Sequence, residues 1–379
     1  MKKTRFIVFL TAFIFLAAIK VSASEIDKKI TSAIDNELED FINSLPQNVA
    51  SFFPTELLNG DFSALANGEI DEKSFLDLIS TYLLSGINII VKNFASILSL
   101  IIIISIFNTL SSSLDGSNTS NILSLCSSLC ISITVFNICG GLVLNVSQYM
   151  ELLCNIMGAF VPLMLVLLTM GGNISTAIVT NGSMLLFINI IEKFILVFML
   201  PLTKMCLTFG CAKSLNSDID LGGISKTVKT AFTSVTVFTM SIFMFVLSYK
   251  STLTQSVDSL SIKTARFAIS SFVPLVGSSV NDALRTVTSS LSLIKSSCGI
   301  VAIIAIVVLM LPIIINLFLN KLSFSILSSM SKSIGGNKEG AILEEADSIC
   351  GFLLTLVCCT CVLFIFALTI FLKSGATSG

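Results

Sequence analysis

The stretch that decides the fold class of this chain is residues 299–319, GIVAIIAIVVLMLPIIINLFL. It is 21 residues long and contains no charged side chain. A helix needs about 20 consecutive apolar residues to cross the hydrocarbon core of a bilayer. The stretch therefore predicts a transmembrane helix.

Similar apolar runs recur on both sides of it, and each is long enough to cross a bilayer. The sequence therefore predicts an all-α, polytopic integral membrane protein with about seven transmembrane helices. Five fall in a membrane domain at 83–249, and two in a further part at 299–379. Lys and Arg are not concentrated in the loops of one side, so they do not fix the orientation. The predicted spans are residues 87–107, 122–144, 152–170, 183–205, 230–249, 299–319 and 350–372.

The composition of the 379 residues agrees with this class, since 54% are hydrophobic, 12% are charged and the mean hydropathy is +0.96. The net charge of −1 includes no basic excess, which argues against nucleic-acid binding. Histidine is absent, which removes imidazole catalysis and imidazole metal ligation. We therefore expect no catalytic site, no metal and no cofactor, and we interpret the eleven cysteines as small apolar packing residues.

The N-terminus is typical of a secretory signal peptide. A basic start is followed by the apolar run 6–19 and by small residues up to Ala23, so residues 1–23 are predicted to be removed. The alternative is a retained N-terminal anchor, although the apolar run is shorter than a spanning helix requires.

Residues 24–82 form a predicted extracytoplasmic region with 12 acidic residues and three lysines. Apolar residues recur every three or four positions from Ile26 to Phe41, which predicts an amphipathic helix at 25–45. A region of this size with few large apolar side chains buries little surface alone. We expect it to pack on a partner or on the membrane domain.

Glu192 and Lys193 lie at the middle of the predicted span 183–205. Ionisable groups at that depth cost at least about 2.5 kcal/mol each and usually face a water-filled cavity or a partner. Adjacent residues point about 100° apart on a helix, so these two cannot neutralise each other on one face. They are candidate polar contacts within the membrane. The alternative is a helix broken near Pro201, or a re-entrant segment, with both charges at an interface.

Residues 250–298 contain two helical apolar stripes that are separated by Pro274 and Gly277. Asp282 and Arg285 lie on the polar face of the second stripe, at a spacing that permits an ion pair. This pattern predicts an amphipathic helical hairpin that lies on the membrane or lines a pore, with these four residues as a candidate break and partner surface. The alternative is an ordinary connecting loop.

Several short motifs carry a resemblance to a known family. They are LLNGDF at 57–62, TARFA at 264–268, FVPLVG at 272–277, Asp282-Ala283 and SLIK at 292–295. Together with the order of signal peptide, acidic region and membrane spans, they resemble the stage III sporulation protein AE family. Many members have a second glycine where this chain has Ser278, which loosens the turn requirement.

The resemblance implies a multi-pass protein of the mother-cell membrane around the forespore. Its implied partners are the lipid bilayer, other stage III A proteins and a forespore membrane protein, and homo-oligomers are compatible with that role. Together these proteins would form a secretion-like channel that sustains late forespore gene expression.

Two rival functions remain at this stage. A stand-alone secondary transporter for a small solute would use broken helices in two corresponding halves, and no convincing internal repeat is visible. An intramembrane enzyme would need a nucleophile and a base within the spans, and only a Ser-Lys arrangement with Lys193 is compatible with the sequence.

Overall fold

The computed structural model describes residues 36–50, 72–112, 117–170, 174–215, 227–246, 248–249 and 277–373. Within these ranges the regular elements are helices and no strand occurs, so the chain is all-α, as predicted. Besides a helical segment at 36–44, the elements are α2 (Gln47–Ala50), α5 (Glu72–Ser112), α6 (Ser117–Met170), α7 (Ile174–Lys193), the π-helical η1 (Phe194–Met199), α8 (Leu200–Leu215), the helix Thr227–Val246, α10 (Gly277–Ser333) and α11 (Asn337–Lys373).

Some predicted features lie outside the described residues. These are the signal peptide at 1–23, the stretch 51–71 of the extracytoplasmic region, and the stretch 250–276 that holds the first arm of the predicted hairpin. They remain predictions.

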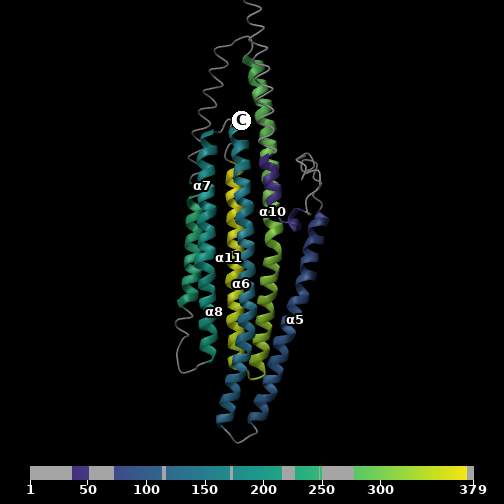
Figure 1. Cartoon of the computed structure of the whole chain (residues 1–379), viewed down its shortest axis with the longest axis vertical. Coiled ribbons are helices and arrows are strands. Elements are labelled where there is room, and N and C mark those ends of the chain that lie inside the picture. The colour runs from purple at the N-terminus through teal and green to yellow at the C-terminus, as the bar shows by residue number, and fades with distance from the viewer. Residues whose placement is uncertain are drawn as a thin grey trace, which may run out of the picture.

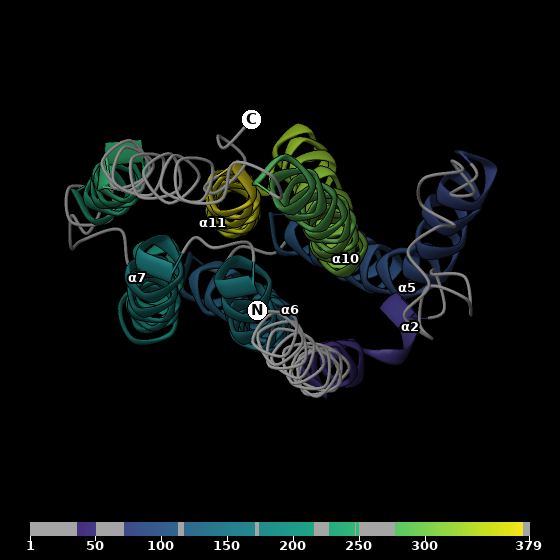
Figure 2. The ribbon, with the colours of Figure 1, turned by 90° about the horizontal axis from the view of Figure 1, so that it is seen from above.

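The long helices run up and down beside one another as a bundle (Figure 1). α5 descends and α6 returns upward, and α10 descends to a tight turn from which α11 returns upward. Seen from above, α11 lies between α10, α6 and the helix Thr227–Val246, whereas α5 lies at the edge (Figure 2). α11 therefore packs against α6, α8 and α10.

Within the described part of the chain, six helices are long and apolar enough to cross a membrane. A multi-pass membrane protein is thus supported, with one fewer helix than the seven predicted spans. Their apolar segments are Gly86–Phe107, Leu125–Met170, Asn181–Ala212, Thr227–Val246, Ser297–Ser333 and Asn337–Leu372.

The difference in number arises in α6, where the sequence predicts two spans, at 122–144 and 152–170. The structure has one unbroken helix of 54 residues instead. The polar stretch between the two predicted spans, residues 145–151, contains neither Gly nor Pro, so nothing in it ends a helix. At 1.5 Å per residue α6 is about 81 Å long, more than twice the thickness of a hydrocarbon core.

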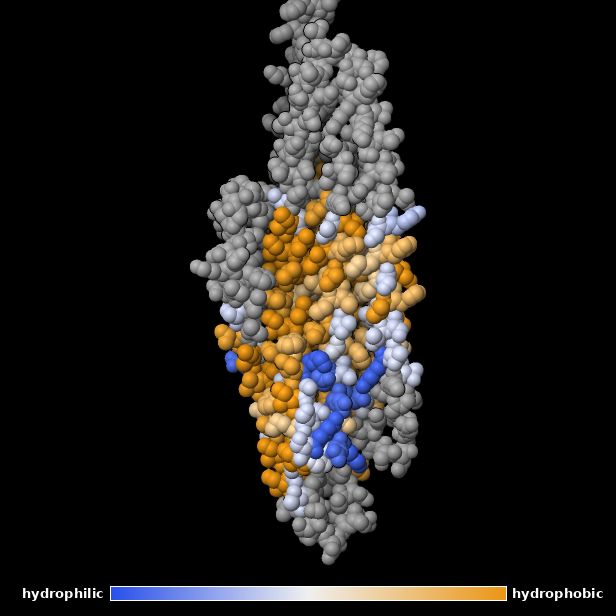
Figure 3. Space-filling view, turned by 180° about the vertical axis from the view of Figure 1, so that it is seen from behind, coloured by the Kyte–Doolittle hydropathy of each residue, from blue (hydrophilic) through white to orange (hydrophobic). Residues whose placement is uncertain are grey.

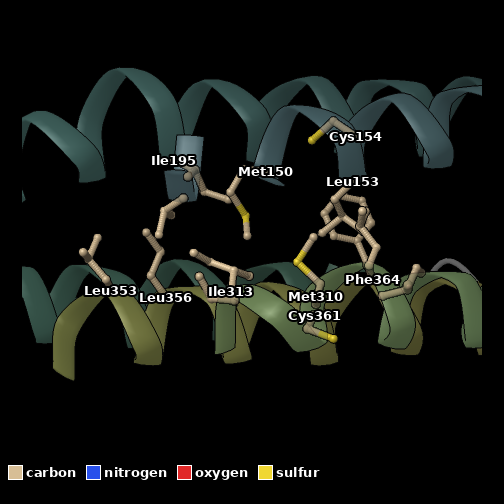
Figure 4. Packing of buried hydrophobic residues seen from close by; sticks show 14 of the residues in the cluster. Met150, Leu153, Cys154, Ile195, Met310, Ile313, Leu353, Leu356, Cys361 and Phe364 are labelled. Carbon is tan, nitrogen blue, oxygen red and sulfur yellow. The ribbon is translucent and has the colours of Figure 1, made fainter. Parts of the chain in front are cut away.

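The core lies where α6, α10 and α11 meet. Figure 4 shows Met150 and Leu153 of α6 pointing toward Met310 and Ile313 of α10, with Phe364 of α11 beside them. All five side chains are almost completely buried. Unbranched and aromatic residues fill the irregular space between helices that cross at close range.

The segment 36–44 belongs to the predicted extracytoplasmic region, and it packs on the bundle. Leu38 and Phe41 are buried, and the ring of Phe41 lies edge-on to Phe160 of α6 with centroids 5.6 Å apart. Phe160 in turn contacts Phe371 of α11 at 6.4 Å. The acidic neighbours of Phe41 stay exposed, as the predicted amphipathic pattern requires.

The turn between α10 and α11 depends on a glycine. Gly335 has φ of 91°, a backbone conformation that glycine adopts without the steric cost of a Cβ atom. The N–H of Gly336 donates to the carbonyl oxygen of Ser331 at 2.9 Å, which closes the end of α10. The two helices can therefore run antiparallel after only three residues.

Replacing Gly335 by Ala should lower the free energy of unfolding by about 1 kcal/mol. At a positive φ the Cβ atom of alanine lies too close to the following carbonyl oxygen. Thermal unfolding of the detergent-solubilised protein measures this. Gly141→Ala is the matched control: it lies within α6 with nothing within 4 Å of the added Cβ, and it should raise the free energy by about 0.5–1 kcal/mol. Shifts of the same sign in both variants would contradict the role of the turn.

Candidate functional site

Glu192 and Lys193 are the last two residues of α7 and lie within the apolar segment Asn181–Ala212. Lys193 is exposed and Glu192 is half-buried. In the part of the chain that the structure describes, neither side chain forms an ion pair. Asn189, a candidate partner one turn earlier, donates to the carbonyl oxygen of Leu185 at 2.8 Å instead.

The helix that carries this pair is not broken near Pro201. Directly after Lys193 it widens into the π-helical segment η1, in which the N–H of Leu200 donates to the carbonyl oxygen of Ile195, five residues back. Pro201 has no N–H, and its ring clashes with the preceding turn of a regular α-helix. The wider turn accommodates Pro201, and such segments occur frequently at functional sites.

Glu192 lies near Cys154 of α6. Both Glu192 and Glu151 lie close enough to the thiol of Cys154 to act on it electrostatically. Of these two carboxylates, the sequence singled out only Glu192.

The predicted hairpin residues are only partly described. Gly277 is the first residue of α10, and the backbone of Asp282 and Arg285 is helical within it. The second predicted arm is therefore collinear with the span 299–319, with no loop between them. Pro274 and the side chains of Asp282 and Arg285 lie outside the described residues.

A second group of charges, which sequence reasoning missed, lies on the lower half of the bundle. Three ion pairs connect α10, α11 and the helix Thr227–Val246, and hydrophilic side chains gather on this part of the molecule in Figure 3. We call them the ion-pair patch. They are Lys229–Glu345, Lys321–Asp347 at 2.9 Å and Lys332–Glu344 at 2.5 Å.

The pair between Lys229 and Glu345 is the most enclosed of the three, with side chains 24% and 13% exposed. Gly210 of α8 makes room for it, because a Cβ atom at this position would lie 2.8 Å from Cγ of Glu345. The carboxylate of Glu345 therefore joins α11 to Thr227–Val246 while α8 packs directly on its stem.

Glu339, at the start of α11, is a buried carboxylate at 4% exposure. The hydroxyls of Ser127 and Ser128 on α6 donate to its Oε1 atom at 2.7 and 3.3 Å. These hydrogen bonds satisfy the charge and fix the height of α6 against α11.

The signal for the ion-pair patch was present in the sequence. Seven charged residues fall in the stretch 320–349, between the last two predicted spans. Two of them, Glu344 and Asp347, have the i, i+3 spacing of residues on one helix face. Within the described ranges, no group of three or more Cys, Asp or Glu could hold a metal ion.

The sequence of the chain is similar to those of known proteins. The model of the family described as stage III sporulation protein AE matches residues 59–375. A curated relative, stage III sporulation protein AE of Bacillus subtilis (strain 168), is 23% identical over 221 residues. That alignment covers 57% of this chain and 54% of the relative, so the chain spans about half the length of the curated relative it matches. No solved structure matches the chain.

Proposed function

Because the chain belongs to the stage III sporulation protein AE family, we propose that it is a membrane component of a channel-like, secretion-like complex between mother cell and forespore. It resides in the mother-cell membrane around the forespore. Its partners are other stage III A proteins and a protein of the forespore membrane. The complex sustains late gene expression in the forespore.

The family match carries this proposal. It extends over residues 59–375 and so includes all six apolar segments that the structure describes, from Gly86 to Leu372. The matched residues therefore include the whole described membrane bundle. We assign the function of the family to this bundle and not to a separate domain.

The structure supports a structural role more than the rival functions. Each apolar helix in the described ranges continues through its proline or its polar residues, whereas transporter sites are built on unwound helices. The family is a sporulation family and not a known enzyme family.

The test is purification of the tagged chain from sporulating cells of its host. We expect it to carry other stage III A proteins, and we expect deletion of its gene to stop late forespore gene expression after engulfment. A chain that purifies alone, together with normal late expression in the deletion strain, would reject the proposal.

Within this role we assign Glu192 and Lys193 as polar contacts to a partner inside the membrane. Lys193→Met should weaken co-purification of the other stage III A proteins at least about tenfold, the effect of losing one charge-assisted contact. Lys204→Met is the matched control, since Lys204 is also an exposed lysine in Asn181–Ala212. Equal effects of the two substitutions, or none, would remove Lys193 from the contact.

A further inference from the structure

The lower half of the bundle carries two opposite kinds of surface at the same height. Large apolar side chains of α5 and α6 are exposed there, and the ion-pair patch lies on α10 and α11 (Figure 3). The exposed apolar residues are Ile102, Ile103, Ile106 and Phe107 on α5, and Leu125, Leu129, Ile133 and Phe136 on α6.

Contacts fix the relative heights of these surfaces. Ile101 and Ile104 of α5 line the same small pocket as Ser331 and Glu339, which flank the turn between α10 and α11. The turn is therefore level with the lower end of the apolar segment Gly86–Phe107.

Lys321 lies ten residues before Ser331 along α10, which is about 15 Å higher in the bundle. Asp347 lies eight residues after Glu339 along α11, about 12 Å higher, and it meets Lys321 there. The apolar segment of α5, Gly86–Phe107, is 22 residues or about 33 Å long. The pair of Lys321 and Asp347 is thus near the middle of the depth that α5 crosses.

Lipid is a poor environment for this pair. The side chains of Lys321 and Asp347 are 37% and 23% exposed, and a charge at the centre of a bilayer costs at least about 2.5 kcal/mol. Below Lys321, the exposed residues Ser325, Ser329 and Lys332 follow at intervals of four, four and three, which places all four on one face of α10. A polar strip, bordered by the exposed side chains of Leu322 and Ile326, therefore extends from the turn to the pair.

We propose that this face of α10 and α11 lines a water-filled passage that enters at the α10–α11 turn and reaches the middle of the membrane. At the same heights α5 and α6 face lipid. The passage suits ions and other hydrophilic solutes. The inference depends on the heights of the helices and not on the role in sporulation.

The test compares two single cysteines at the same height on opposite sides. Ser325 lies between the contacts of Ser328 with Gly340 and of Lys321 with Asp347, and so is level with Leu343, four residues after Glu339 on α11. Ile133 on α6 is close to this height, because it lies five residues after Ser128, which donates to Glu339, and α6 and α11 run in the same direction (Figure 1). The side chain of Ile133 is 61% exposed.

Ser325→Cys and Ile133→Cys are made in a background in which the exposed Cys126 and Cys130 are Ala. Membranes from sporulating cells, opened by freezing and thawing, are treated with a charged methanethiosulfonate that does not enter lipid. Labelling above the parent should be at least about tenfold faster at position 325 than at 133, because the reactive thiolate forms readily only in water. Ser329→Cys is the second probe of the same face, for use if Ser325→Cys does not accumulate.

Rapid labelling at both positions would place this height outside the lipid and overturn the proposal. Protection at both positions would mean that lipid or another chain covers the face, and it would overturn the proposal as well. Neither result concerns late forespore gene expression, so the failure of this inference and the failure of the proposed function are distinguishable.

Discussion

Replacing Lys229 by Met should lower the free energy of unfolding by about 3 kcal/mol, the largest effect expected of any single charge in the bundle. The substitution leaves the carboxylate of Glu345, 13% exposed, between α8 and α11 with no cation beside it. Breaking an enclosed ion pair from one side costs much more than the pair contributes, because the remaining charge keeps its desolvation penalty. Thermal unfolding in detergent, or in lipid nanodiscs, measures the loss.

The double variant Lys229→Met, Glu345→Met separates this explanation from simple loss of packing. With both charges removed, apolar side chains of similar volume occupy the site, and stability should return to within about 1 kcal/mol of the parent. If the double variant were as unstable as the single one, the ion pair would not be the cause. Lys332→Met is the exposed comparison: its partner Glu344 is 64% exposed, and the effect should be close to zero.

Phe160→Ala should cost about 4 kcal/mol, the other large effect. Phe160 is completely buried, and its ring joins Phe41 of the segment 36–44 to Phe371 of α11. Truncation removes buried apolar area and leaves a cavity between helices that cannot collapse independently. The same substitution should loosen the segment 36–44, which hydrogen exchange of its backbone amides would detect.

Phe136→Ala on the same helix provides the control for Phe160→Ala. Phe136 is 47% exposed on the side of α6 that we assign to lipid, so its removal should cost less than about 1 kcal/mol. Equal losses from the two substitutions would mean that Phe136 also packs against protein, in contradiction to a lipid-facing surface on α6.

The sequence predicted the helical class and most of the membrane helices, because an apolar run of fixed length is a direct consequence of bilayer thickness. It misjudged where helices end. The stretch 145–151 is polar enough to resemble a loop, but without Gly or Pro the hydrogen bonds of α6 continue through it. Polar residues indicate exposure to water or to a partner. A helix ends where Gly or Pro changes the backbone conformation or removes a hydrogen-bond donor.

The sequence singled out Glu192 and Lys193 because a charge within an apolar run can be recognised from the sequence alone, and their role stays a prediction. The partners of Lys229 and Lys321 were not, because each lies on a different helix and only the packing of α11 brings Glu345 and Asp347 to them. The hydrogen bonds of Glu339 could not be predicted for the same reason, because its two serine partners are on α6.

The contacts of α11 with α6, α8 and α10 have a consequence for how the protein is made. α5 to α10 leave the ribosome first, and lipid covers the apolar faces of α6, α8 and α10 that meet α11 until α11 is synthesised. The earlier helices can contact one another before then, but the bundle is complete only when α11 packs on these three faces. A cell that interrupts translation before α11 is left with a chain that quality-control proteases can recognise, so a partly made copy is removed before it can enter a larger assembly.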